Sequence, residues 1–414
     1  MSLNFGRTQL AIPGPSVIPE RVLNAMHRPS PNIYHGELIE MVDTLYPDLK
    51  AVARTKHDVA IYISNGHGAW EAALDNTLNS GDTVLVLKTG RFGAGWGEMA
   101  RKNGIKTEVM DFGMQSDADP NRVEQALRAD KEGKIKAVLT VQTDTASSVS
   151  NDIPALRSAI DSASHDALFM VDCIASLGCE PFEMDLWGVD VMVTGCQKGL
   201  MTPAGMSFVY FNDKAAKASK NANPTFYWDW TLRANAEIFY QKFAGTAPTH
   251  HLYGLREALN ILVHEEGIKQ AWARHRTIAH AIWSAVDVWG QDGTMRHNIN
   301  DPDKRSLAVS AVNTIAGVAG KLRSWCEANT GVTLGIGLGL AEPNTPQWDQ
   351  HFRIGHMGHQ NIAMVMATLG SIETALKANG IPHGEGALSA AAKVLAAHKT
   401  QAPCCDPILD SQCC

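Results

Sequence analysis

Short apolar runs alternate with segments expected to be helical between about residues 20 and 260. Most of the runs are almost continuously hydrophobic, which is typical of strands in a sheet that is covered on both faces. Strand and helix in alternation predict a mainly parallel sheet with right-handed crossovers, and so an α/β fold. The expected strands are 58–64, 83–88, 105–110, 136–142, 167–172, 189–194 and 206–211, and helices include 66–79, 92–103, 120–131 and 151–164.

The rest of the chain divides around this seven-stranded sheet. A long helix is expected over about 252–287, with a break near Gly267. Prolines at positions 13, 15 and 19 would interrupt a helix near the start, so the first twenty residues are expected to form an extended arm. The predicted organisation is an arm (1–20), a large domain (21–287), a smaller α/β C-terminal domain (288–395) and a flexible tail (396–414).

Composition fits this picture and argues against several classes of protein. The chain has 414 residues, 45% hydrophobic and 19% charged, as expected for a globular protein of two or three domains. A net charge of −7 without a basic block argues against nucleic-acid binding. An 18-residue apolar run and a hydrophobic leader are both absent, so we expect no membrane span and a cytoplasmic location.

The eight cysteines fall into two groups. Those within the predicted domains are expected to behave as small buried hydrophobic residues. Those in the tail form two pairs, but no histidine or fixed scaffold accompanies them, so we expect no metal site. The first group is Cys173, Cys179, Cys196 and Cys326, and the second is Cys404, Cys405, Cys413 and Cys414.

Two residues at strand ends suggest a specific chemistry. Asp172 ends the apolar run 167–172, and Lys198 follows the run 189–194. Taken singly, the aspartate could cap a helix and the lysine could be a solvated loop residue. Ligands bind at the carboxyl ends of strands in such sheets. There, a lysine amine can form a Schiff base with pyridoxal phosphate, and an aspartate can keep the pyridine nitrogen protonated.

A glycine-containing turn supports the same cofactor. The segment Ser64-Asn-Gly-His-Gly68 follows a predicted strand and opens a predicted helix. Glycines there let the backbone approach an anion, and the helix start offers free N–H groups to a phosphate. The glycine pattern alone describes an ordinary turn equally well. The turn, the aspartate and the lysine, in this order on one sheet, favour a pyridoxal phosphate site.

Over residues 10–390 the chain resembles the class V aminotransferases of pyridoxal phosphate fold type I. It is most similar to the group of alanine–glyoxylate and serine–glyoxylate aminotransferases. The resemblance implies a homodimer with a shared active site. It rests on Pro13-Gly-Pro-Ser16, Gly66-His-Gly-Ala-Trp-Glu71, the segment Asn76 to Asp82, Val171-Asp-Cys-Ile-Ala-Ser-Leu-Gly178, Gly195-Cys-Gln-Lys-Gly199 and Phe352-Arg-Ile-Gly-His-Met-Gly358.

The resemblance assigns cofactor-binding roles to several positions. Lys198 would be the Schiff-base lysine and would later carry the substrate proton, which requires a lowered pKa and therefore burial near a cationic ring. Asp172 would pair with the pyridine nitrogen. The remaining matches are Asn65, Gly66, His67 and Gln197 at the phosphate, Thr145 near the phenolic oxygen, and Phe92 over the ring, although Phe92 could also be plain core packing.

Other positions would serve the substrate or the partner subunit. Arg353 would grip the substrate α-carboxylate with two parallel hydrogen bonds, the alternative being a surface ion pair. Thr246 matches a residue that the neighbouring subunit donates to the phosphate. Phe243 stands where some relatives have a phosphate-contacting tyrosine, so that contact would be lost or supplied elsewhere. Tyr34, with His35, falls near a substrate segment and could equally be a surface residue.

The expected reaction is a ping-pong transamination from serine or alanine to a 2-oxo acid, with glyoxylate the favoured acceptor. Alternatives are another pair in the same family, such as aspartate with glyoxylate or a pyruvate-linked reaction, and a lyase such as a cysteine desulfurase. A desulfurase needs a reactive cysteine on a mobile loop, and Cys326 lies in an apparently helical segment. A non-catalytic scaffold is disfavoured because both Lys198 and Asp172 are present.

Overall fold

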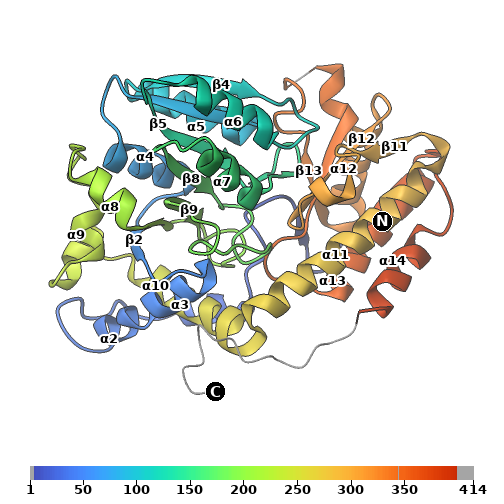
Figure 1. Ribbon diagram of the computed structural model, residues 1–414. Helices are drawn as coiled ribbons and strands as arrows, with labels where there is room; N and C mark the ends of the chain where they lie inside the picture. The colour runs from blue at the N-terminus through green and yellow to red at the C-terminus, as the bar shows by residue number, and fades with distance from the viewer. Residues whose placement is uncertain (1–3, 344, 399–414) are drawn as a thin grey trace.

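The computed structural model describes residues 4–343 and 345–398, and its centre is a seven-stranded sheet (Figure 1). Five neighbouring strands run parallel, and β10 is antiparallel to both of its neighbours, β2 and β9. All seven expected strands are present, which confirms the predicted mainly parallel sheet. In spatial order they are β2 (Asp58–Tyr62), β10 (Ser207–Phe211), β9 (Val191–Gly195), β8 (Leu168–Asp172), β5 (Ile135–Val141), β3 (Thr83–Lys88) and β4 (Lys106–Asp111).

Alternating side chains of each central strand enter cores on opposite faces of this sheet. On β3, Val84 and Val86 pack with the residues of α4 and α5, whereas Leu85 and Leu87 pack with those of α6 and α7. Both faces are therefore apolar, which explains the nearly continuous hydrophobic runs. The helices are α4 (Gly66–Thr77), α5 (Arg91–Lys102), α6 (Pro120–Ala129), α7 (Ile153–Ser162) and α8 (Asp213–Ser219).

The long helical region near residue 260 joins the two domains. It consists of α10 (Thr249–Leu259), the π-helix η2 (Asn260–Glu266) and α11 (Ile268–Trp289), with the expected break at Gly267, where φ is 82°. The far half of α11 packs into the small-domain core (Figure 1). The other large-domain elements are α1 (Glu20–Met26), α2 (Glu37–Asp43), α3 (Leu45–Ala53), β6 (Thr143–Asp144), β7 (Val149–Ser150), α9 (Trp230–Ala234) and η1 (Phe239–Phe243).

The small domain holds a five-stranded sheet in the order β1-β13-β14-β12-β11. Its first strand, β1 (Gln9–Ala11), comes from the expected N-terminal arm and lies parallel to β13. The extended arm is thus built into the small-domain sheet. The remaining elements are η3 (Gly290–Asp292), β11 (Met295–His297), η4 (Pro302–Lys304), β12 (Val309–Thr314), α12 (Val318–Thr330), β13 (Val332–Ile336), η5 (Pro346–Gln350), β14 (His351–Gly355), α13 (Ile362–Ala378) and α14 (Ala387–Ala396).

The two groups of cysteines lie in different parts of the chain, and only the first group is described by the structure. The four domain cysteines are buried and free, as expected. Most of the expected tail, including its four cysteines, lies outside the described residues.

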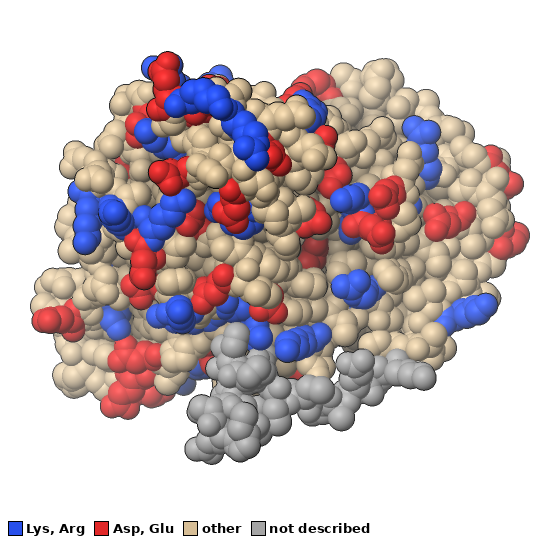
Figure 2. All heavy atoms as spheres, in the orientation of Figure 1, with Lys and Arg blue, Asp and Glu red and all other residues tan. Residues whose placement is uncertain are grey.

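None of the helices in residues 4–343 and 345–398 is long and apolar enough to cross a membrane. Positive and negative side chains are interspersed over the face shown in Figure 2.

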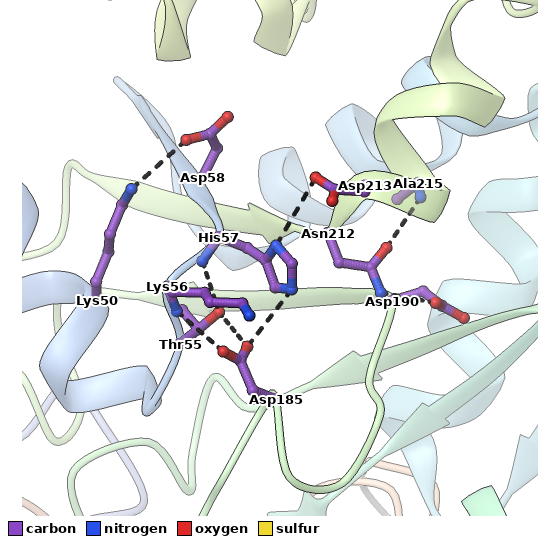
Figure 3. Close-up of polar contacts among 10 residues, drawn as sticks. All are labelled: Lys50, Thr55, Lys56, His57, Asp58, Asp185, Asp190, Asn212, Asp213 and Ala215. Atoms are coloured by element: carbon purple, nitrogen blue, oxygen red, sulfur yellow. Dashed lines mark hydrogen bonds and ion pairs between the residues drawn. The ribbon is translucent and has the colours of Figure 1, made fainter. Parts of the chain in front are cut away.

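A polar cluster lies at the end of the large sheet that is opposite the carboxyl ends of its parallel strands (Figure 3). Asp185 accepts hydrogen bonds from the Thr55 hydroxyl (2.5 Å) and the Lys56 backbone N–H (3.1 Å). The His57 ring lies between Asp185 and Asp213, at 3.8 and 4.0 Å from their carboxylate oxygens. These contacts fix the entry into β2, whose other end leads into α4.

A buried carboxylate connects the two domains. Glu180, in the large domain, accepts hydrogen bonds from the hydroxyls of Thr143 (2.8 Å) and Ser150 (3.1 Å). It also accepts from the Ser306 hydroxyl (2.7 Å) and the Leu307 N–H (3.1 Å), which lead into the small domain. Burial raises the pKa of this carboxyl, and the four donors oppose that rise. The four hydrogen bonds offset the free-energy cost of burying this carboxylate.

We expect Glu180→Ala to lower the free energy of unfolding by about 3 kcal/mol, because several buried donors would lose their acceptor at once. Urea unfolding followed by circular dichroism would measure the loss. Glu132→Ala is the control, since Glu132 forms only an exposed ion pair with Lys134 and should leave the unfolding midpoint unchanged. Equal midpoints for the two variants would contradict the role of Glu180.

Candidate active site

A cavity lies at the carboxyl ends of β2, β5, β8 and β9, where ligands bind in sheets of this kind. It brings together most of the residues that the sequence predicted at a cofactor site. Its walls are formed by Asn65, Gly66, His67, Trp70, Phe92, Val141, Thr143, Thr145, Asp172, Ile174, Ala175, Gln197 and Lys198.

Asp172 presents a buried carboxylate to this cavity from the end of β8. Its Oδ1 accepts a hydrogen bond from the Ile174 N–H at 2.6 Å, and its Oδ2 accepts one from the Trp70 indole at 2.8 Å. Burial raises the pKa of Asp172 to about 7, while the two hydrogen bonds and the charge of Lys198 oppose the rise. A further cation near this carboxylate would favour its charged form.

Lys198 extends into the same cavity from the loop after β9, and the N-terminal segment covers it. Its Nζ donates a hydrogen bond to the Pro13 carbonyl. The Ser16 hydroxyl donates to the Lys198 carbonyl at 2.7 Å and so fixes the lysine backbone. Between them, Gly14 has a φ of 99°, and a Cβ there would lie 2.1 Å from Nζ. Only glycine therefore fits above the lysine.

The surroundings of Lys198 favour its neutral amine. Burial is the largest effect, the charge of Arg353 adds to it, and Asp172 opposes both. Together they lower the pKa of Lys198 to about 8. A neutral amine is the nucleophilic form, so the lysine is reactive near physiological pH.

The start of α4 forms one wall of the cavity. Asn65 caps the helix, and its Oδ1 accepts hydrogen bonds from the N–H groups of His67 (3.0 Å) and Gly68 (3.4 Å). The His67 N–H is thus bonded to this cap, whereas the Gly66 N–H is at the helix start and has no acceptor within the helix. A Cβ at Gly66 would lie 2.3 Å from Ile174, so glycine is required at this close contact.

Arg353, on β14 of the small domain, lies next to the cavity wall through its bond to Thr145 but is not part of that wall. Its Nε donates to the Ile336 carbonyl at 2.6 Å, and its Nη1 donates to the Thr145 carbonyl at 2.7 Å. The side chain is buried, and burial lowers the pKa of Arg353 to about 10, with Asp144 opposing. The guanidinium makes these bonds to backbone carbonyls rather than forming the surface ion pair considered as an alternative.

Two residues that sequence reasoning missed orient those that it found. Asp144 is buried but is not part of the cavity wall, and it accepts hydrogen bonds from the backbone N–H groups of the wall residue Phe92 (2.8 Å) and of Ala146 (3.0 Å). Trp70 bonds to Asp172 and contacts the edge of Phe92. Trp70 follows Gly66 by four residues, which is about one helical turn, so helical spacing could have placed it on the same face. Nothing in the sequence around Asp144 indicates its role.

Besides Arg353, which only adjoins the cavity wall, three of the predicted residues lie away from the cavity. Tyr34 is 79% exposed and does not line it. Thr246 is exposed as well and is absent from the cavity wall. Phe243 is buried and packs edge-on against Phe239, with ring centroids 5.5 Å apart, so it belongs to the core.

Comparison with known proteins identifies the family. Residues 14–356 match the family model for aminotransferase class V. The chain belongs to the class V aminotransferases. This aminotransferase is 36% identical to a serine–glyoxylate aminotransferase of Methylorubrum extorquens, over 94% of its own length and 95% of that protein. It is 33% identical to an L-aspartate–glyoxylate aminotransferase of Paracoccus denitrificans, over 92% and 94% of the two chains.

Solved structures agree on the fold. The aminotransferase superimposes on a ureidoglycine–glyoxylate aminotransferase of Bacillus subtilis with a TM-score of 0.84, covering 96% of this chain and all of the other at 25% identity. A pyridoxamine–pyruvate aminotransferase of Mesorhizobium loti gives a TM-score of 0.83 at 23% identity, with the same coverage. These structures confirm fold type I, and the match to the class V family together with the curated relatives confirms a transaminase.

Membership of this family implies pyridoxal phosphate, and the cavity of the aminotransferase fits that group. It contains the carboxylate of Asp172, the amine of Lys198 and the start of α4, where Gly66 packs closely against Ile174. In addition, the Gln197 Oε1 atom is buried and has no hydrogen-bond partner in the part of the chain that the structure describes. A buried polar atom in this condition indicates a missing partner. Because an amide oxygen accepts hydrogen bonds, a water that accompanies the bound cofactor would supply that partner.

We expect the cofactor-free aminotransferase to take up pyridoxal phosphate at a rate that rises with pH and levels off above about pH 8. The rate follows the neutral fraction of Lys198, whose pKa is about 8. Stopped-flow absorbance of the bound cofactor would record it. Arg353→Met should move the midpoint upward, because a cation that lowers the pKa of Lys198 is removed.

Arg323→Met is the matched control for this pH profile. Arg323 also lies in the small domain, but it pairs with Asp349 and is not among the charges that shift the pKa of Lys198. Its replacement should leave the midpoint where it is in the wild type. A wild-type midpoint close to the ordinary lysine value of 10.5 would contradict the lowered pKa.

Proposed function

We propose that this enzyme is a pyridoxal phosphate-dependent aminotransferase that moves the amino group of a small amino acid, serine or alanine, to glyoxylate. The observation that carries the proposal is the pairing of a reactive amine, Lys198, with a buried carboxylate, Asp172, at the ends of adjacent strands that face one cavity. The serine–glyoxylate aminotransferases of Methylorubrum extorquens and Hyphomicrobium methylovorum, 36% and 34% identical, support the choice of substrates.

Lys198 and Asp172 would do the chemical work. When bound, pyridoxal phosphate supplies an aldehyde that takes up amines and a ring that withdraws electrons. The amine of Lys198 would hold the aldehyde. In its neutral form the same amine would take the proton from the donor Cα. Asp172 keeps the pyridine nitrogen protonated, so that the ring withdraws electrons effectively.

The other cavity residues would hold the two molecules in place. Asn65 (through its amide nitrogen), Gly66, His67 and Gln197 would bind the phosphate, with Thr145 near the phenolic oxygen and Phe92 against the ring. Arg353 would bind the substrate α-carboxylate. Its two bonds to backbone carbonyls orient the guanidinium and leave its Nη2 nitrogen for that purpose. Tyr34 remains a candidate substrate contact for an enzyme whose N-terminal segment lies near the cavity.

A homodimer would complete the site. Thr246 is exposed and lies away from the cavity of its own chain, which is consistent with donation to the phosphate of the other subunit. Several large apolar side chains nearby in sequence are exposed as well, as expected for a surface that a second copy covers. They are Phe226, Leu232, Ile238 and Tyr240.

A second donor, aspartate, is favoured by one observation. Arg91, the first residue of α5, is exposed beside the cavity residue Phe92. Burial lowers the pKa of His67, another cavity residue, and the charge of Arg91 adds to this effect. Within the described residues Arg91 has no ion pair or side-chain hydrogen bond. A second carboxylate on the donor would pair with it. The L-aspartate–glyoxylate aminotransferase of Paracoccus denitrificans supports this alternative.

The desulfurase alternative has less support. Cys326 lies within α12, is fully buried, and has a pKa raised by burial to about 12. The other three cysteines in the described residues are also buried. A thiol in such surroundings is a poor nucleophile.

We expect serine or alanine alone to convert the yellow, pyridoxal phosphate-loaded enzyme to the amino form, and glyoxylate to restore the original absorption. Stopped-flow absorbance would follow both halves. Lys198→Ala should react at least about 100-fold more slowly, because the proton carrier is removed. Failure of the wild-type protein to bind pyridoxal phosphate, or release of sulfide from cysteine without any reaction with serine, alanine or aspartate, would refute the proposal.

The same assay separates the two donors. If aspartate is the natural donor, Arg91→Ala should slow its half-reaction about tenfold while changing that of serine less than about twofold, since only aspartate loses a charged partner. Lys102→Ala is the control, because Lys102 ends the same helix and pairs with Glu98 instead. Equal effects on both donors would exclude Arg91 from donor selection.

We expect co-expression of Lys198→Ala and Thr246→Arg subunits to recover activity that neither homodimer has. In a mixed dimer, one site combines an intact Lys198 with an intact Thr246 from the other subunit. Because one of its two sites is intact, the purified mixed dimer should have up to about half of the wild-type activity per dimer. Purification through two different tags and a transaminase assay would test it. A dimer without recovery would show that Thr246 serves its own subunit or neither.

A further inference from the structure

Asp172 depends on a side chain outside its own loop. Of its two hydrogen-bond donors among the described residues, the Ile174 N–H belongs to the loop that Asp172 begins, while the Trp70 indole comes from α4. The indole donates to Oδ2 at 2.8 Å, and both partners are buried. Two donors on two different elements fix the plane of the carboxylate. Each oxygen can accept another hydrogen bond, so the bonds leave capacity for a ring nitrogen.

Neighbouring rings fix the position of the indole. Trp70 stacks on Trp96, with centroids 5.9 Å apart and an interplanar angle of 13°. Its ring centroid also lies 4.5 Å from that of His67 and 6.4 Å from that of Phe92. Fully packed rings of this size have few alternative rotamers. The N–H is therefore held toward Asp172 before any ligand enters.

Helix α4 contributes residues to the cavity both at its start and one turn further along. It begins at Gly66, in the wall proposed for the phosphate, and Trp70 lies four residues further along, a rise of about 6 Å. The same rigid element thus sets the phosphate wall and, through Trp70, the carboxylate at the other end. A cofactor held at one end by this helix would meet an Asp172 that the helix has already oriented.

We propose that Trp70 is a positioning residue that, through its hydrogen bond to Asp172, orients this carboxylate and raises the affinity of the cofactor's pyridine nitrogen for its proton. The inference rests on the proposed function. Burial alone makes the charged form of Asp172 costly, and Trp70 is one of the two hydrogen-bond donors that oppose this cost. Without it the carboxylate would be less charged and free to turn, and the ring nitrogen would lose its proton more readily.

Trp96 provides a matched comparison within the same cluster. It is fully buried like Trp70 and stacks on it, but its indole N–H has no hydrogen-bond partner among the described residues. Replacing either tryptophan by phenylalanine removes similar volume and one indole N–H. Only in the case of Trp70 is a bond to the catalytic carboxylate lost.

The experiment loads wild-type enzyme, Trp70→Phe and Trp96→Phe with pyridoxal phosphate labelled with ¹⁵N in the pyridine ring. The ¹⁵N chemical shift, followed against pH, reports the proton on that nitrogen directly and without turnover. In Trp70→Phe the nitrogen should lose its proton at a pH at least about one unit lower than in the wild type, a tenfold change in affinity. The Trp96→Phe titration should match the wild type.

Kinetics supply a second readout. Trp70→Phe should lower kcat of the serine half-reaction about tenfold and leave KM within about twofold, because Arg353, the residue proposed to bind the substrate, is unchanged. If Trp70→Phe does not fold, replacement of Trp70 by 3-benzothienylalanine keeps the ring shape and substitutes sulfur for the N–H. This variant should show the same ¹⁵N shift and the same kcat loss.

Two results would overturn the inference. One is a Trp70→Phe or benzothienyl variant whose nitrogen titrates like that of the wild type. The other is an equal displacement in Trp96→Phe, which would show that packing and not the hydrogen bond is responsible. Both presuppose a wild-type protein that binds pyridoxal phosphate and transaminates. A wild type that does neither would instead refute the proposed function.

Discussion

A carboxylate that has to remain charged inside the protein is the constraint on which the rest of this site depends. Water would stabilise the charge of Asp172, but the residue ends a buried strand. The protein replaces water with a backbone N–H, an indole N–H and the nearby charge of Lys198. Each comes from a different segment, so the loop after β8, helix α4 and the loop after β9 must all be in place before the charge is tolerated.

The small domain contributes through two polar contacts that cross the domain boundary. Arg353 bonds to the Thr145 carbonyl, beside the cavity, and its charge makes the neutral amine of Lys198 more favourable. Glu180, which follows the end of β8 in the sequence, accepts hydrogen bonds from donors in both domains. Because these bonds are buried, a shift of one domain against the other would leave several polar groups unpaired. The relative position of the domains and the reactivity of the lysine are therefore coupled.

The sequence allowed the sheet, its two strand-end residues and the break at Gly267 to be predicted, because each leaves a local signal: an apolar run, a charge that ends it, a glycine. The bond from Trp70 to Asp172 joins residues 102 positions apart, and the buried cap that Asp144 provides for α5 likewise depends on tertiary packing. Neither has a local signal. Likewise, the prolines near the start indicated an extended segment, but not that β1 would pair with β13. Tyr34 and Thr246 were assigned by resemblance alone, and both lie outside the cavity of a single chain.

The position of β1 has a consequence for how the protein is made. Gln9–Ala11 is synthesised more than 300 residues before its partner β13 (Val332–Ile336). Between β1 and the large domain lie Pro13 and Gly14, which cover Lys198. Local segments can fold while the chain is still growing, but a pairing of such long range closes late. The lysine thus acquires its cover only after β13 has been synthesised, and a chain that stops before β13 would leave that amine exposed to other aldehydes.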